Sequence, residues 1–179
     1  MALAANYLYF HVLILLSTFI ICKSDTPDCV YTVYVKTGTK ENAGTDSTIN
    51  LGLLDAYGNG FEMYDIKGQG GLMGPGHNYF EAENIDIFSI VGSCLANSIC
   101  LMYLRSDGKG YMPGWYVEYV DVFTASKIMN RCDHEYFTVN EWLVLDEPPY
   151  NLTLYRDNCV SSKKNQMMNG LDVSLSSIV

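Results

Sequence analysis

Residues 30–36, Val-Tyr-Thr-Val-Tyr-Val-Lys, decide the fold class of this chain. All but the last are β-branched or aromatic residues, which favour β-strands, and their alternation supplies two usable strand faces. Seven further stretches of this kind follow between turn residues, at 49–55, 61–66, 85–91, 99–105, 115–124, 136–139 and 152–156. Eight short strands with little helical periodicity predict an all-β antiparallel sandwich or barrel.

Three local signals refine this prediction. The Asn-Gly step in residues 57–60 lies between two strands and predicts a β-hairpin. Residues 125–129 are expected to form one helical turn. In the strand 115–124 the hydrophobic alternation changes phase, so we expect a bulge near Tyr119. Such a bulge would place four residues on the core face, namely Trp115, Val117, Val120 and Val122.

The first 22 residues carry no charged side chain and are mostly apolar. This pattern, followed by Lys23 and Ser24, predicts a secretory signal peptide over 1–24; a signal anchor is the alternative, since about 20 apolar residues can span a bilayer. We therefore expect a single domain over 25–160, a flexible tail over 161–179, and a secreted or endoplasmic reticulum location.

The chain is acidic, with a formal net charge of −9. A nucleic-acid partner is excluded because it requires a basic surface. Electrostatic docking on anionic lipid is disfavoured for the same reason, unless bound cations invert the local field.

Five cysteines follow the signal peptide, and in a secretory compartment disulfide bonds are the expected state. A bond between Cys29 and Cys159 would join the ends of the domain, and one between Cys94 and Cys100 would close a local loop. Cys132 would then stay unpaired. Spacing alone does not fix this connectivity.

The loop Ala43-Gly44-Thr45-Asp46-Ser47 offers carbonyls, a hydroxyl and a carboxylate, the ligands that Ca²⁺ prefers. Gly44 lets the backbone bend sharply. The same residues are also common in an ordinary hairpin turn, so both readings stay open at this stage.

No catalytic motif is present in the sequence, and an enzyme is not expected. Two loops instead place apolar residues in flexible surroundings, Leu72-Met73 between glycines and Tyr111-Met112 before a proline. Such side chains either enter a membrane or a partner's groove, or fold back over the ends of the sandwich. Asn151 begins an Asn-Leu-Thr glycosylation sequon.

Several segments occur in a characteristic order: 31–38, 43–47, 71–75, 78–81, 86–88, 114–120 and 141–143. This series resembles the PLAT (LH2) domain, and in particular the plant secretory proteins associated with stress that consist of a single PLAT domain. The resemblance covers about residues 29–159. It implies an eight-stranded β-sandwich of two four-stranded sheets.

The resemblance also implies a function and a set of site residues. PLAT domains dock catalytic partners onto membranes or lipid, often with Ca²⁺. Carried over to this chain, the ion ligands would be the backbone carbonyls of Gly44 and Thr45 and the carboxylate of Asp46, with Asp65 as an acidic ligand from a second loop. Asn42 stands where some relatives have Asp, and the loop before Trp115 lacks a carboxylate, so the set is short of acidic ligands.

Together these observations predict a non-catalytic PLAT module that binds lipid, a membrane surface or a protein partner in stress or defence responses. A protein–protein adaptor without lipid affinity is the alternative, and a stand-alone hydrolase is the least favoured reading.

Overall fold

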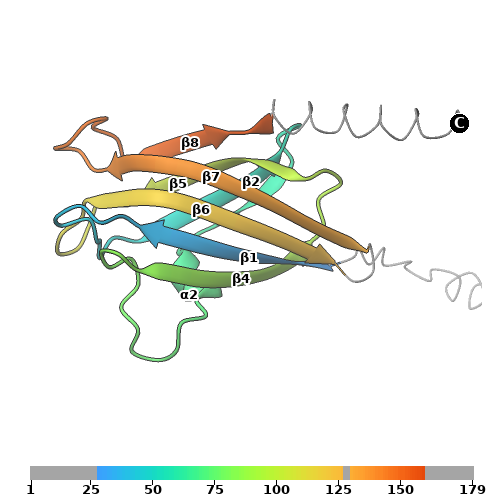
Figure 1. The fold of residues 1–179 in the computed structure, drawn as a ribbon, viewed down its shortest axis with the longest axis horizontal. Helices are drawn as coiled ribbons and strands as arrows, with labels where there is room; N and C mark the ends of the chain where they lie inside the picture. Colours follow the sequence, from blue (N-terminus) through green and yellow to red (C-terminus); the bar gives the residue numbers. More distant parts are fainter. Residues whose placement is uncertain (1–27, 127–129, 160–179) are drawn as a thin grey trace, which may run out of the picture.

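The computed structural model describes residues 28–126 and 130–159, which form eight β-strands and one short helix (Figure 1). The predicted signal peptide and tail lie outside these residues, as do the predicted domain boundaries. In the described part of the chain no helix is long and apolar enough to cross a membrane. The elements are β1 (Asp28–Thr37), β2 (Ile49–Asp55), β3 (Gly60–Met63), α2 (Ile66–Gly70), β4 (Ile85–Ser93), β5 (Ile99–Ser106), β6 (Trp115–Ser126), β7 (Arg131–Leu143) and β8 (Thr153–Asp157).

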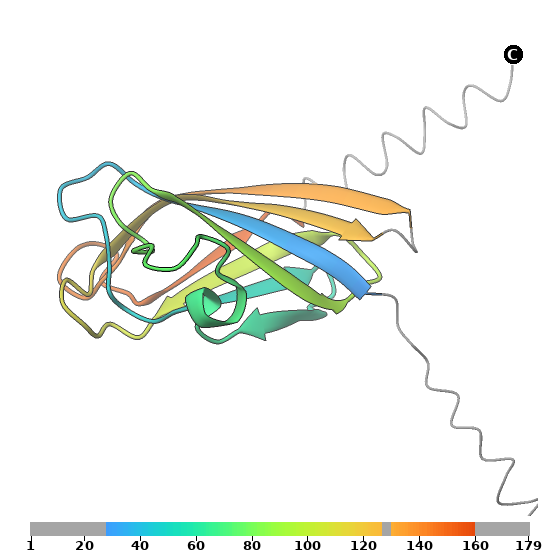
Figure 2. The same ribbon diagram turned by 90° about the horizontal axis from the view of Figure 1, so that it is seen from below.

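The strands form two four-stranded antiparallel sheets that pack face to face (Figure 2). One sheet has the order β4-β1-β6-β7 and the other has the order β3-β2-β5-β8. Neighbouring strands are antiparallel throughout both sheets. The predicted fold class, an eight-stranded β-sandwich, is confirmed.

The strand bounds differ from the predicted ones where local chemistry intervenes. The third strand ends at Met63, because Asp65 takes a left-handed conformation and caps α2 by accepting a hydrogen bond from the Gly68 amide. The helical turn expected from residue 125 is wrong for Ala125 and Ser126, which continue β6 and pair with β7. Residues 127–129 are outside the described residues. The hairpin at 57–60 is confirmed, with its positive φ at Gly58.

The bulge near Tyr119 is confirmed. The pairing of β6 with β7 shifts register between Val117 and Tyr119. As expected, the shift brings four hydrophobic residues of the strand to the core, where all are buried: Trp115, Val117, Val120 and Val122. The indole Nε1 of Trp115 donates a hydrogen bond to Thr37 Oγ1 at 3.0 Å, so the polar atom of this buried ring is satisfied.

The disulfide pairing differs from the predicted one. Cys29 bonds to Cys94, and Cys100 bonds to Cys159, while Cys132 is free and exposed. The register explains the pairing: β1 and β4 are neighbours, as are β5 and β8. Cys94 lies just after β4 and Cys159 just after β8, so each bond joins a strand to the segment that follows its neighbour in the same sheet. The predicted Cys29–Cys159 bond would instead have to join the two sheets.

Candidate functional site

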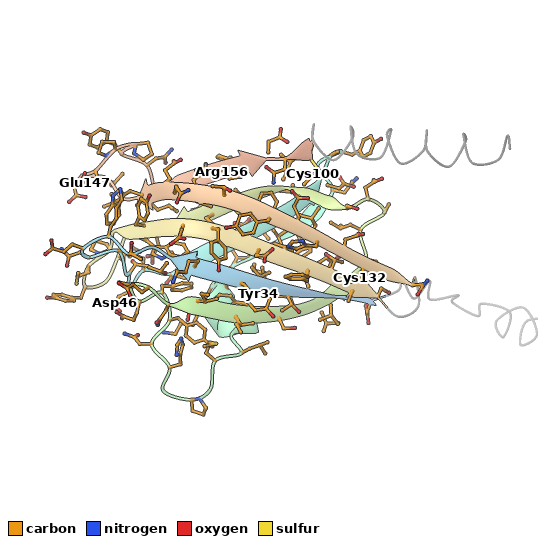
Figure 3. All side chains as sticks on the ribbon, viewed as in Figure 1. Tyr34, Asp46, Cys100, Cys132, Glu147 and Arg156 are labelled. Carbon is orange, nitrogen blue, oxygen red and sulfur yellow. A yellow bond between two sulfur atoms is a disulfide. The ribbon has the colours of Figure 1, made fainter. Side chains whose placement is uncertain are left out.

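Three loops meet at one end of the sandwich and enclose a groove of about 750 Å³. Asp46 and Glu147 both lie at this end, opposite the end that carries Cys132 (Figure 3). The loops are residues 38–48, 107–114 and 144–152. The groove is lined by Glu41, Asn42, Gly108, Tyr111, Met112, Pro113, Gly114, Trp142, Val144, Leu145, Asp146, Glu147 and Leu152.

Side-chain hydrogen bonds to the backbone fix the first loop against the second. Thr45 Oγ1 donates to the Pro113 carbonyl at 3.2 Å, and Ser47 Oγ donates to the Lys109 carbonyl at 2.8 Å. Asp107 Oδ1 accepts from the Thr48 amide at 3.1 Å. Hydrogen bonds made by short polar side chains thus hold the two loops together where they leave the sheet.

The third loop is joined to the sandwich at its base. The Val144 amide donates to the Asn151 carbonyl at 3.0 Å and closes the loop. Trp142, just before it, packs against Tyr116 with ring centroids 5.3 Å apart, and the Lys40 ammonium lies 4.1 Å from the Tyr116 centroid. One wall of the groove is therefore held by ring packing and a backbone hydrogen bond, while Tyr111 and Leu145 at its loops are exposed.

The groove combines apolar tips with an acidic rim. Tyr111 is 79% exposed and Leu145 is 66% exposed, whereas Met112 is 40% exposed. Carboxylates come from Glu41, Asp146 and Glu147, and no Lys, Arg or His is among the described lining residues. Large exposed apolar side chains gathered at one end are typical of a docking surface.

The predicted calcium ligands come from two segments, the loop 38–48 and Asp65 before α2. Thr45 uses its hydroxyl on Pro113 and on the Ser47 amide, and Asp65 caps α2. Asn42 and Asp46 are exposed, while Gly44 packs against the backbone near Phe80. Within 28–126 and 130–159, no three His, Cys, Asp or Glu side chains are grouped to hold a metal ion. Two of the predicted side chains thus have hydrogen-bond partners within the protein, and the calcium site stays a prediction.

The predicted docking loops separate in the structure. Tyr111 and Met112 line the groove. Leu72 is 58% exposed but belongs to the loop between α2 and β4, which does not line the groove, and Met73 packs against the core. Met73 is positioned by its amide, which donates to the Tyr79 hydroxyl at 2.8 Å.

Sequence reasoning missed the third loop. Leu145, Asp146 and Glu147 line the groove although no motif marked them. The signal that could have indicated this loop is an apolar residue followed by two acidic residues and then Pro148-Pro149. This pattern is typical of a surface turn. The sequon residue Asn151 lies at the base of this loop, where it is exposed and its Oδ1 accepts from the Thr153 amide.

The two described histidines each pair with an aspartate. His77 Nε2 lies 2.6 Å from Oδ1 of the fully buried Asp86, whose other oxygen accepts from the Phe80 amide. His134 Nε2 lies 2.6 Å from Asp121 Oδ1. The first pair fastens the loop between α2 and β4 to the sandwich, which is a structural role.

Comparison with known proteins identifies the family. The family profile described as "Embryo-specific protein 3, (ATS3)" matches residues 17–143. PLAT domain-containing protein 2 of Arabidopsis thaliana is 43% identical over 143 residues, covering 80% of this chain and 78% of the relative. PLAT domain-containing protein 1 of the same plant is 45% identical over 135 residues, covering 75% and 74%. The chain belongs to the PLAT domain family, as the order of its sequence segments predicted.

A solved structure of a larger protein contains a domain with a similar fold. Coral 8R-lipoxygenase matches with a TM-score of 0.50 and 27% identity, over 72% of this chain but 16% of the lipoxygenase chain. That lipoxygenase is described as activated by calcium through a C2-like domain. This chain is therefore similar to one domain of that enzyme.

Proposed function

We propose that this chain is a non-catalytic docking module that attaches to a lipid surface through the groove between loops 38–48, 107–114 and 144–152. The observation that carries the proposal is the exposure of Tyr111, Met112 and Leu145 on tips around one groove. Family membership supports it, because the similar domain of a lipoxygenase is described as C2-like.

The exposed area supports weak, reversible attachment. Full burial of a Leu or Met side chain contributes about 1.5–3 kcal/mol. Leu145, which is 66% exposed, would gain about two thirds of that value, or about 1–2 kcal/mol. Burial of Met112, which is 40% exposed, would contribute less than burial of Leu145, and burial of Tyr111 would contribute an amount similar to that of Leu145. The acidic rim and the net charge of −9 oppose attachment to anionic lipid, so a zwitterionic surface is the expected target.

Vesicle flotation tests the proposal. Phosphatidylcholine vesicles are expected to carry the protein to the top of a density gradient, and the variant Tyr111→Ser/Leu145→Ser is expected to float at least tenfold less. Leu72→Ser is the matched control, because Leu72 is 58% exposed but lies outside the groove, and it should float like the wild type. Absence of flotation with phosphatidylcholine and with phosphatidylserine would refute lipid docking and leave the protein–protein adaptor.

Calcium is tested in the same gradient. The proposed attachment rests on apolar side chains and requires no ion, so flotation should persist in a calcium chelator. If calcium strengthens flotation and Asp46→Asn abolishes that gain, Asp46 is a ligand of the ion, as the sequence predicts.

A secretory location and a role in stress or defence complete the proposal. The two disulfide bonds support the location, because such bonds persist in oxidising compartments. The role in stress rests on the resemblance to plant secretory PLAT proteins.

A further inference from the structure

The outer face of the sheet β3-β2-β5-β8 carries an aromatic surface away from the groove. Gly52 pairs with Glu62 on one side and with Tyr103 on the other, and Tyr103 in turn pairs with Tyr155. Because directly paired residues point to the same face, these four positions form one row across four strands. None of them lines the groove.

The ring of Tyr103 lies over Gly52. A Cβ atom at Gly52 would be 2.0 Å from Tyr103 Cε1 and 2.2 Å from Cζ, so only glycine leaves room for the ring. One side of the ring therefore covers the strand, and the other side faces outward. Tyr155 lies beside it with ring centroids 5.7 Å apart at 45°, and it is 66% exposed. A cross-strand aromatic pair stabilises a sheet, but this exposure also leaves a ring surface free.

Polar groups border the two rings. The Glu62 carboxylate lies 3.9 Å from an Arg105 guanidinium nitrogen, and the Arg105 guanidinium carbon lies 5.8 Å from the Tyr103 centroid. Tyr64, 61% exposed, follows β3 on the Glu62 side. The Glu62 carboxylate also interacts with the hydroxyls of Tyr64 and Tyr103. This interaction raises the pKa of Tyr64, and burial together with this interaction raises the pKa of Tyr103. The row thus presents aromatic rings beside a carboxylate and a guanidinium.

We propose that this face, defined by Glu62, Gly52, Tyr103, Arg105 and Tyr155, binds a neutral oligosaccharide. Tyrosine rings present an electron-rich surface to the C–H bonds of a pyranose ring. The Arg105 guanidinium, whose side chain is 49% exposed, offers donors for the hydroxyls at its edge.

Charge and dimensions favour this ligand over others. Glu62 and Arg105 cancel each other, so the row is locally neutral in a chain with net charge −9 and complements an uncharged ligand. The two tyrosine ring centroids are 5.7 Å apart, a distance on the order of the size of one sugar ring. An anionic ligand would be opposed by the overall charge, and a lipid interior would leave the ion pair without hydration.

Isothermal titration of the full chain with cellohexaose and with laminarihexaose tests the proposal, with oligogalacturonate as the charged comparison. At least one neutral probe is expected to bind, and the charged one is not. Tyr155→Ala should weaken binding at least tenfold without unfolding the protein, because Tyr155 is 66% exposed. Gly52→Val should weaken binding as well, because it displaces the Tyr103 ring while keeping the tyrosine.

Two controls separate this site from other effects. Tyr57→Ala, at a hairpin tip that is 75% exposed, should bind the sugar like the wild type. Tyr111→Ser/Leu145→Ser should also keep sugar binding, so failure of lipid docking does not affect this result. The proposal is overturned if neither neutral probe binds at millimolar concentration, or if Tyr155→Ala, folded by circular dichroism, binds as tightly as the wild type.

Discussion

Removal of one disulfide bond tests the pairing that the fold imposes. In the variant Cys100→Ser/Cys159→Ser the bond between β5 and the end of β8 is lost. Its partners are 59 residues apart in sequence. In the chain-entropy description, cross-linking a loop of this length stabilises the folded state by about 4 kcal/mol, because it restricts the unfolded chain. The bond Cys29–Cys94, with a separation of 65, is left intact.

Urea denaturation measures the effect. With a slope of about 2 kcal/mol/M, a loss of about 4 kcal/mol lowers the denaturation midpoint by about 2 M. Cys132→Ser is the matched control, because Cys132 is exposed and unpaired, and its midpoint should change little.

Thiol labelling in the unfolded variant gives the decisive result. With the observed pairing, Cys29 and Cys94 stay bonded to each other and resist labelling, as peptide mass spectrometry would show. With the pairing expected from sequence, the double variant would leave both without a partner. Labelling of Cys29 and Cys94 would therefore refute the pairing, as would a loss of stability near zero.

Two further predictions concern single side chains. Burial, with a smaller contribution from the neighbouring Glu62, raises the pKa of Tyr103 to about 12 from its ordinary 10.0. Because the pKa of Tyr103 is higher in the folded state than in the unfolded state, the stability that depends on its protonated hydroxyl is fully present below pH 10 and is lost as the pH rises towards 12. Ultraviolet titration should show one tyrosine that ionises late, and Tyr103→Phe should remove it. An unchanged titration curve in Tyr103→Phe would contradict the assignment. If the chain passes through the secretory pathway of a plant cell, Asn151 should carry a glycan. Mass spectrometry should then show an added mass that an endoglycosidase removes and that Asn151→Gln eliminates. Secreted protein of unmodified mass would contradict the prediction for this sequon.

The strand content followed from local patterns. Residues 30–36 alternate β-forming side chains, and β1 extends the predicted strand by only a few residues at its two ends. The change of hydrophobic phase around Tyr119 was sufficient to predict the bulge, because a strand has to keep its apolar residues on the core face. The end of β3 was less predictable, since Asp65 caps α2 with a left-handed backbone that residue type alone does not reveal.

The candidate site was only partly accessible from sequence. Tyr111 and Met112 could be selected as apolar residues in a flexible loop. Leu72 has the same local character but lies outside the groove, while Leu145 joins Tyr111 from a loop more than thirty residues later. Proximity of this kind depends on which strand ends share one edge of the sandwich.

The sequence by itself determined the β-sandwich class and the family, because both are encoded in strand periodicity and in the order of short segments. Only the tertiary structure decided which cysteines pair, which loops enclose the groove, and that Tyr103 lies over Gly52 beside Tyr155. These contacts depend on strand order and register, and residues that are distant along the chain become neighbours only after the two sheets have formed.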